Sequence, residues 1–278
     1  MERKIIKQGH NTMTITLPSA WVKNFNLRSG DKIDLHQREN GLFLTTERKD
    51  EKLKTSFDLD GLDIPVIWKY FMVLYREGYD EIKVNFNPQS SYDNPYKYIT
   101  QHSLDKKYQS AELKISPFEL IQQMSNRFIG FEVIEQHKDY CIIRDMSILS
   151  SKEFDSSVRR VFLLLNQMIS EILEAVEKND YKLVEHIHDT DINVDKFYDY
   201  CVRVINKTGF KESKKASLIF STLFILEMLG DELKSIGNHI ASDHKDLSLR
   251  NLVEITRLVS SSLIYLAAYT TNSAKRQF

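Results

Sequence analysis

The chain has 278 residues, of which 42% are hydrophobic and 28% charged, and its formal net charge is −1. This length and composition predict a globular protein of about two domains. The near-zero net charge excludes binding to nucleic acid through overall charge, so any such binding has to rest on a local basic surface. The first residues lack the apolar core of a signal peptide, and no apolar run is long enough to span a bilayer. Cys141 and Cys201 form no disulfide or metal-binding pattern, and we therefore expect a cytoplasmic protein.

Proline and glycine divide the chain into regions of different character. All five prolines precede residue 118, whereas residues 151–278 contain no proline and only three glycines. Because both residues interrupt helices, the last part should consist of long helices and the first part of shorter elements. We expect an α+β protein with three domains, at residues 1–50, 51–150 and 151–278. Residues 1–54 carry 11 basic and 7 acidic side chains, and this is the basic segment of the chain.

The first 46 residues predict four strands and one short helix. Residues 3–8 and 12–17 alternate as strands, a helix begins at Pro18, and two further strands run through Ile33–Leu35 and residues 42–44. So small a unit buries too little surface to be stable alone, and its strand edges stay open. We therefore predict that two chains combine their halves into one closed barrel.

The segment from Arg3 to Thr46 resembles the AbrB/SpoVT/MazE family of swapped-hairpin DNA-binding domains, through the pattern L-P-x-x-W…L-x-x-G-D-x-I that begins at Leu17. The resemblance implies an interleaved homodimer that lays one basic face on DNA. The residues expected on that face are Arg3, Lys4, Lys7, Asn11, Thr12, Lys23 and Arg28. The alternative is that these are ordinary solvated side chains on a barrel that serves only dimerisation.

The middle segment predicts a small α/β layer. The expected elements are a helix at 64–77 ended by Gly78, a strand at 80–86, a polar loop at 87–110, a helix at 117–128, and a hairpin of strands at 130–136 and 140–145. Its three strands are expected to form one sheet that the two helices cover. The segment contains no catalytic constellation, and we interpret it as a spacer between the flanking domains.

The last segment predicts four antiparallel helices, at about 152–178, 181–208, 213–242 and 247–273. Asp191 and Asp195 lie one turn apart on the second helix, and Glu227 and Asp231 one turn apart on the third, where Gly230 allows a close approach. If the two pairs converge, four carboxylates need a cation between them, and oxygen ligands suit Mg²⁺, Mn²⁺, Ca²⁺ or iron. The alternative is a solvated acidic face.

Residues from about Val158 to Ile240 resemble the PhoU family of phosphate-uptake regulators, through "DINVD" at 191–195 and "LEMLGDELKSIGNHI" at 226–240. In that family such acidic pairs bind metal clusters, and the matching ligands here are Asp191, Asp195, Glu227 and Asp231. The chain has one such motif set, whereas PhoU proteins hold two bundles in tandem. Together with the N-terminal segment, the chain resembles archaeal PhoU-like regulators. This implies a DNA-binding regulator of phosphate homeostasis that acts with a phosphate ABC transporter.

Two other readings compete with this one. In the first, the protein is a metal-binding adaptor that regulates a phosphate transporter by protein contact, and the barrel serves only dimerisation. In the second, it is a ferritin-like carboxylate-bridged metal enzyme. Such sites need an ExxH motif on two helices, and the sequence has the one at Glu185–His188. We therefore expect that the protein is not an enzyme.

Overall fold

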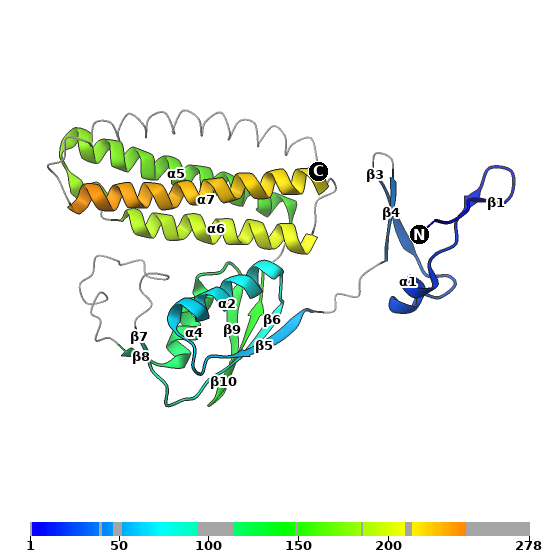
Figure 1. The fold of residues 1–278 in the computed structure, drawn as a ribbon, viewed down its shortest axis with the longest axis horizontal. Helices are drawn as coiled ribbons and strands as arrows, with labels where there is room; N and C mark the ends of the chain where they lie inside the picture. Colours follow the sequence, from blue (N-terminus) through cyan, green and yellow to red (C-terminus); the bar gives the residue numbers. More distant parts are fainter. Residues whose placement is uncertain are drawn as a thin grey trace. The chain divides into compact units, whose positions relative to one another are not determined.

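The structure of the chain is a computed structural model that describes residues 2–38, 41–46, 52–93, 114–147, 150–184, 186–208 and 213–242. The chain divides into two compact units, Met1–Glu51 and Lys52–Phe278 (Figure 1). The helix expected at 247–273 and most of the loop expected at 87–110 lie outside the described residues. Within the described ranges, no helix is both long enough and apolar enough to cross a membrane.

The N-terminal unit consists of two hairpins joined by a short helix. Strands β1 (Ile6–Lys7) and β2 (Met13–Thr14) pair antiparallel, α1 (Ser19–Asn24) follows Pro18, and β3 (Ile33–Arg38) pairs antiparallel with β4 (Gly41–Thr46). The expected order of strands and helix is confirmed, although β1 and β2 are shorter than expected. In its described part this unit therefore contains two separate two-stranded sheets.

None of the described side chains of the N-terminal unit is buried. The register of β3 and β4 places Ile33, Leu35, Leu42 and Leu44 on one face of their hairpin, because Leu35 pairs with Leu44 and Gln37 with Leu42. Leu35 and Leu42 are 64% and 69% exposed. An isolated two-stranded hairpin is marginal in water, so this face needs a covering surface. A barrel shared by two chains would supply it and remains our prediction.

We expect Leu35→Asp to convert the full-length protein to monomers at micromolar concentration, because the new carboxylate would be buried against a second copy. Light scattering after size-exclusion chromatography measures this directly. Asp34→Lys is the matched control, since Asp34 lies next to Leu35 on the opposite face of the strand. A wild-type chain that is monomeric under these conditions would refute the shared barrel.

The first part of the second unit is an α/β layer. Its elements are β5 (Lys54–Asp58), α2 (Ile64–Glu77), β6 (Glu81–Asn85), α4 (Pro117–Asn126), β9 (Phe131–Gln136) and β10 (Tyr140–Asp145), with a short pair of β7 (Tyr92–Asp93) and β8 (Lys114–Ile115). The sheet order is β5-β6-β10-β9, in which β5 and β6 are parallel and the other neighbours antiparallel. The sheet thus has one strand more than the three expected. β5 escaped prediction because its five residues include a single large apolar side chain, Phe57.

The sequence specifies both ends of α2 and the start of α4. Asp63 accepts a hydrogen bond from the backbone N–H of Val66 at the start of α2, and Gly78 ends that helix in the left-handed conformation. Ser116 and Glu119 form a reciprocal capping box at the start of α4. The expected bounds of α2 are confirmed, and α4 ends two residues earlier than expected.

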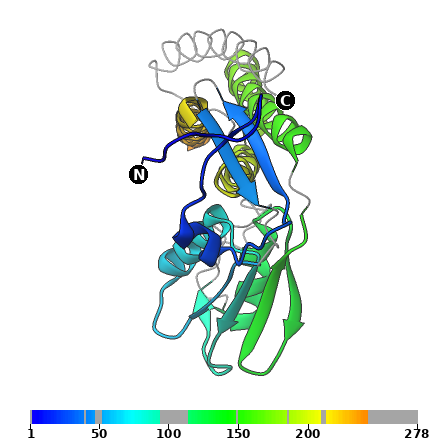
Figure 2. The same cartoon turned by 90° about the vertical axis from the view of Figure 1, so that its right-hand side faces the viewer.

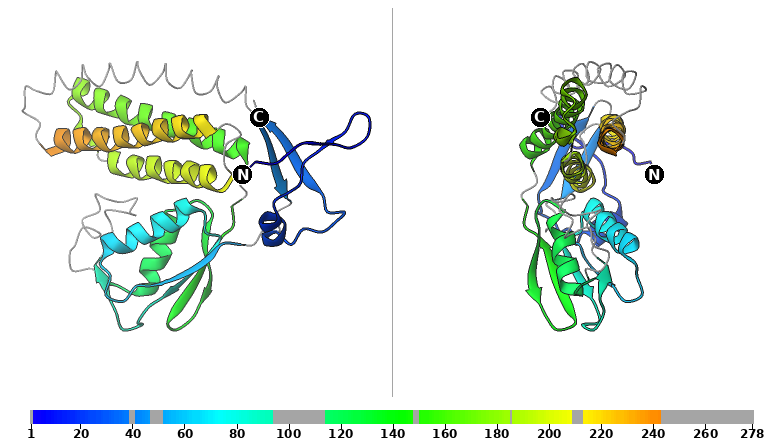
Figure 3. Two further views of the ribbon diagram at one scale, coloured as in Figure 1. Left: turned by 45° about the vertical axis from the view of Figure 1, so that its right-hand side comes forward. Right: turned by 90° about the vertical axis from the view of Figure 1, so that its left-hand side faces the viewer.

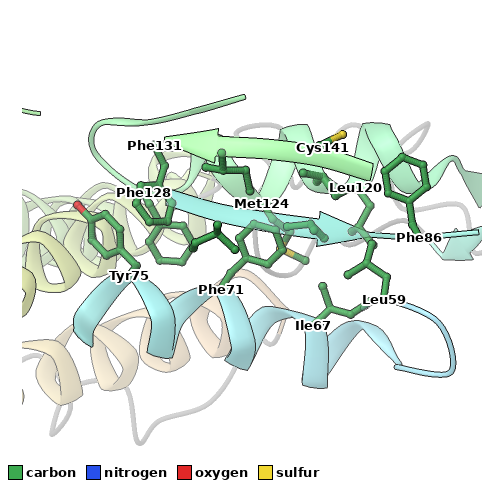
Figure 4. Close-up of a cluster of buried hydrophobic side chains, with 14 of the residues drawn as sticks. Leu59, Ile67, Phe71, Tyr75, Phe86, Leu120, Met124, Phe128, Phe131 and Cys141 are labelled. Carbon is green, nitrogen blue, oxygen red and sulfur yellow. The ribbon is translucent and has the colours of Figure 1, made fainter. Parts of the chain in front are cut away.

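One face of the sheet carries the core of the layer, and α2 and α4 cover that face (Figure 3). Burial alternates along β6, where Ile82 and Val84 are buried and their neighbours are not. Aromatic rings join the helices to the sheet: Tyr75 of α2 meets Phe131 of β9 edge-on with ring centroids 4.8 Å apart (Figure 4). The layer is therefore a packed core in its own right.

The second part of this unit contains three long helices, α5 (Ser151–Lys178), α6 (Ile187–Thr208) and α7 (Ser213–Ser242), which pack side by side (Figure 2). Their core includes Leu165, Met168, Ile172, Val194 and Leu233. The helix expected at 181–208 is divided into a 3₁₀ turn at Tyr181–Val184 and α6. Helix α2 of the layer packs against α6, so α6 contacts the bundle on one side and the layer on the other.

Candidate functional site

The expected acidic pairs lie along the seam between α6 and α7. Asp191 is 2% exposed and lies close to the backbone of α7, because a Cβ atom at Gly230 would be only 3.2 Å from its Oδ1. A Cβ atom at Gly237 would come within 2.5 Å of Ile187. The expectation that Gly230 narrows this seam is therefore confirmed, and Gly237 extends the close approach by two further turns.

A lysine provides the cation between Asp191 and Asp231. Lys234 Nζ donates to Asp191 Oδ2 at 2.6 Å and to Asp231 Oδ1 at 2.5 Å. Burial lowers the pKa of Lys234, but its hydrogen bonds to the two carboxylates outweigh burial and raise that pKa overall. Burial raises the pKa of Asp191, and Lys234 opposes the rise. The seam thus contains a bridge of two carboxylates and one ammonium group.

Asp195 faces the α/β layer and pairs with an arginine there. Arg127 Nη2 donates to Asp195 Oδ2 at 3.0 Å, and Arg127 Nη1 donates to the carbonyl of Ile192 at 2.8 Å. Burial raises the pKa of Asp195, against the positive charge of Arg127, and the charges of Asp191, Asp199 and Glu227 add to the rise. Asp195 therefore lies at the interface with the α/β layer. It also belongs to a row of acidic residues on α6, which we call the acidic row: Asp191, Asp195 and Asp199.

The same face of α6 continues as a row of charged residues spaced four apart: Asp195, Asp199, Arg203 and Lys207. We call these four residues the α6 charge stripe. Each of them binds a group of opposite charge on the α/β layer. Asp199 Oδ1 accepts from Arg76 Nε at 2.6 Å, and Lys207 pairs with Asp80.

Arg203 is the most deeply buried member of the α6 charge stripe, with no solvent exposure. Its Nη1 donates to the carbonyl of Tyr75 at 2.6 Å, and its Nη2 donates to the carbonyl of Tyr79 at 2.8 Å and to Asp145 Oδ2 at 2.5 Å. Tyr75 belongs to the last turn of α2, where its carbonyl also accepts from the backbone N–H of Gly78 and where the helix dipole favours a cation. Arg203 therefore ties α6 to the end of α2 and to β10.

This geometry bears on the metal site expected at Asp191, Asp195, Glu227 and Asp231. Among the described residues, no group of three or more His, Cys, Asp or Glu side chains is arranged to hold a metal ion. Lys234 and Arg127 instead occupy positions next to Asp191 and Asp195. Among these four carboxylates, the buried Oδ1 of Asp191 lacks a hydrogen-bond partner. Metal binding by these four carboxylates stays a prediction.

The residues expected to contact DNA are spread over the N-terminal unit, and all seven are exposed. Arg3 and Lys4 precede β1, Lys7 lies in β1, Lys23 lies in α1, and the others are in turns. Arg28 is positioned by its backbone N–H, which donates to Asp31 Oδ2 at 2.6 Å. The unit therefore offers basic side chains from its first hairpin, its helix and the turn before β3.

The comparisons with known proteins concern this N-terminal unit. Residues 6–52 match the family model described as "Antidote-toxin recognition MazE, bacterial antitoxin". No curated protein and no solved structure gives a significant match to the chain. The resemblance of the first segment to MazE-type domains is thus confirmed. The PhoU resemblance of the bundle receives no support from these comparisons and stays a prediction.

The sequence reasoning missed the roles of three arginines: Arg76 and Arg127, which bind Asp199 and Asp195, and Arg203, which lies on α6 itself and binds Asp145. Arg76 and Arg127 lie at or next to the ends of helices of the α/β layer, far from α6 in the sequence. One signal was present, because Asp195, Asp199, Arg203 and Lys207 share a four-residue spacing. That spacing predicts a common face but does not say which segment covers it.

We expect Lys234→Met to lower the free energy of unfolding by about 3 kcal/mol, because it leaves the buried Asp191 charge without its cation. Adding Asp191→Asn should restore most of the loss, since the second change removes the uncompensated charge. Urea unfolding followed by circular dichroism measures both effects. Lys178→Met is the control, because Lys178 pairs with Glu174 at an exposed site and its loss should change little. Equal stability of Lys234→Met and the wild type would contradict the bridge.

Proposed function

We propose that the protein is a DNA-binding regulator that acts as a homodimer, with DNA bound by its N-terminal unit. The observation that carries the proposal is the MazE-family match over residues 6–52. A domain of this type implies DNA binding. The hairpin–helix–hairpin order, the uncovered apolar face of β3 and β4, and the exposed basic residues of the unit all support it.

The charge of this segment suits contacts with phosphate groups. Residues 1–54 carry a net charge of +4, from 11 basic and 7 acidic side chains, so two chains bring +8 to one surface. The rest of the chain has to offset this charge, because the whole chain has a net charge of −1. Binding would therefore depend on the local field of the N-terminal unit and weaken steeply with salt.

We expect the triple variant Lys7→Ala, Lys23→Ala, Arg28→Ala to bind DNA more weakly and with a flatter dependence on salt. Each lost phosphate contact removes about one unit from the slope of log K against log salt concentration. Fluorescence anisotropy with a labelled duplex at several salt concentrations measures this. The matched control changes Lys69, Lys138 and Lys152 to alanine, three exposed lysines of the second unit. An equal loss in both triple variants would place the DNA-binding surface outside the N-terminal unit.

The second unit has the role of sensor or partner-docking module in this proposal. Control of phosphate uptake, together with a phosphate ABC transporter, rests on the PhoU resemblance of the bundle. Three long helices packed side by side are compatible with such a bundle. The α6 charge stripe joins the bundle to the α/β layer, so a change sensed at the α6–α7 seam would reach the layer through Asp195 and Arg127.

A metal-binding adaptor is the second candidate, in which the N-terminal unit serves only dimerisation. The observation that favours it is the unpartnered and buried Asp191 Oδ1, which faces α7 at Gly230. Asp191, Asp195, Glu227 and Asp231 would hold a hard divalent cation such as Mg²⁺, Mn²⁺, Ca²⁺ or iron. The cation would have to replace Lys234 between Asp191 and Asp231.

If the protein is a metal-binding adaptor, Mn²⁺ should raise the melting temperature of the wild type. The rise should be larger in Lys234→Met, because the ammonium group of Lys234 no longer competes with the metal for the carboxylates. Asp231→Asn in the Lys234→Met background should abolish most of the rise. Differential scanning calorimetry with and without EDTA measures it. If melting is indifferent to Mn²⁺, Mg²⁺, Ca²⁺, Fe²⁺ and chelator in all three proteins, the carboxylates serve the internal charge network alone.

A further inference from the structure

Strand β5 forms one edge of the four-stranded sheet, and in the described part of the chain its sheet neighbour is β6. The carbonyl of Leu53 accepts from the N–H of Glu81 at 3.1 Å, and the N–H of Leu59 donates to the carbonyl of Asn85 at 2.9 Å. In a parallel pair every second residue bonds to the neighbouring strand, so the odd-numbered residues of β5 face β6. The even-numbered residues therefore turn their backbone N–H and C=O groups to the free edge: Lys54, Ser56 and Asp58.

The residues along this free edge are complementary to a second copy of the same strand. In an antiparallel pair with Ser56 of both copies on a two-fold axis, Lys54 of each copy lies opposite Asp58 of the other. Hydrogen-bonded positions recur at every second residue of such a pair, and here they coincide with the three outward residues. All three side chains are exposed and share one face of the sheet, so each lysine meets an aspartate across the axis.

Both charged groups can serve this pairing in addition to their present contacts. Lys54 Nζ donates to Glu81 Oε1 at 2.7 Å, and an ammonium group has three donors. Asp58 Oδ1 accepts from the backbone N–H of Asp60 at 2.9 Å, and a carboxylate has two oxygens. The side chain of Lys54 is 60% exposed, so a second copy can reach it.

The other edge strand of the sheet, β9, lacks this complementarity. Its charged residues are Glu132 and Glu135, both acidic. In an antiparallel pair of two β9 strands, no register places either carboxylate opposite a positive charge of the strand. The match between two copies is therefore a property of β5.

Helix α2 adds an apolar surface on the β5 side of the layer. Tyr70 of α2 stacks on Phe57 of β5 with ring centroids 5.2 Å apart, which places this flank of the helix over the edge strand. Val66 and Val73 lie one turn from Tyr70, and the three side chains are 36% to 44% exposed. A pair of β5 strands would bring the two copies of α2 together on one face of the joined sheet, where these side chains can cover one another.

We propose that the β5 strands of two copies pair antiparallel about Ser56 and join their four-stranded sheets into one continuous sheet. The proposal rests on the proposed homodimer, because a pair of five-residue strands is too short to hold two chains together by itself. Strand β4 ends at Thr46 and β5 begins at Lys54, so the chain between them can span at most about 28 Å. Chains joined by the barrel therefore present their β5 strands to each other at a high effective concentration.

A cysteine on the two-fold axis tests the pairing in the full chain. Opposite residues at a hydrogen-bonded position have Cα atoms about 5.5 Å apart, which is within the range of a disulfide. In oxidised glutathione, Ser56→Cys should therefore form at least ten times more disulfide-linked dimer than Lys83→Cys. Lys83 is the matched control, because it is exposed and lies beside Ser56 in β6. Three strand spacings of about 4.8 Å would separate its two copies.

A non-reducing denaturing gel measures the yield of linked dimer, and the native cysteines should not contribute to it. Cys141 and Cys201 are fully buried, and burial raises the pKa of both thiols. Light scattering on the reduced wild type separates the two levels of the proposal. If the wild type is dimeric and Ser56→Cys links no more than Lys83→Cys, the β5 contact alone is overturned. A monomeric wild type overturns the homodimer and this contact with it.

Charge reversal tests the lysine–aspartate match independently. In the Ser56→Cys background, Asp58→Lys should lower the yield of linked dimer at least fivefold, because Lys54 then lies opposite a lysine. Glu135→Lys in the same background is the control, since it makes the same charge change at an exposed site on the other edge strand. Circular dichroism during melting checks that both variants fold. If Asp58→Lys leaves the yield unchanged, or if both variants lower it equally, the proposed register is refuted.

Discussion

The second unit depends on one constraint, which is that the charges carried by helix α6 are buried between two packing surfaces. Asp191 and Asp199 are each at most 2% exposed and Arg203 has no exposure, so each would destabilise the folded state strongly without an opposite charge. Lys234 of α7 meets this need on the bundle side. Arg76 and Asp145 of the α/β layer meet it on the other side. The layer and the bundle are therefore mutually dependent parts of one folding unit.

The N-terminal unit differs from the second unit, because none of its described side chains is buried. All of them are at least partly exposed, and Leu35 and Leu42 on the apolar face of the β3–β4 hairpin are 64% and 69% exposed. In the proposed dimer this module would gain its stability from association, whereas the second unit has internal cores of its own. The MazE-type match, at residues 6–52, covers this first unit.

Charge pairing also limits what the acidic row can do. Carboxylates at a spacing of four residues are typical of metal sites and equally typical of interfaces between helices. Here Asp195 and Asp199 bind Arg127 and Arg76 of the layer, and Asp191 binds Lys234. The row thus acts first as the electrostatic contact between structural parts. Any ligand that enters it has to compete with a side chain that is held in place.

The sequence by itself determined the local elements, because periodicity and caps act over a few residues. It predicted the bounds of α2 from its apolar spacing and Gly78, the starts of α5 and α7, and the position of Gly230 at a close helix contact. It missed β5, which has one large apolar side chain and depends on pairing with β6. Only the tertiary structure decided which charges meet. Arg127 and Asp195 are 68 residues apart, and Arg203 and Tyr75 are 128 apart. Spacing along one helix shows which side chains share a face, whereas the partner of that face depends on how distant segments pack.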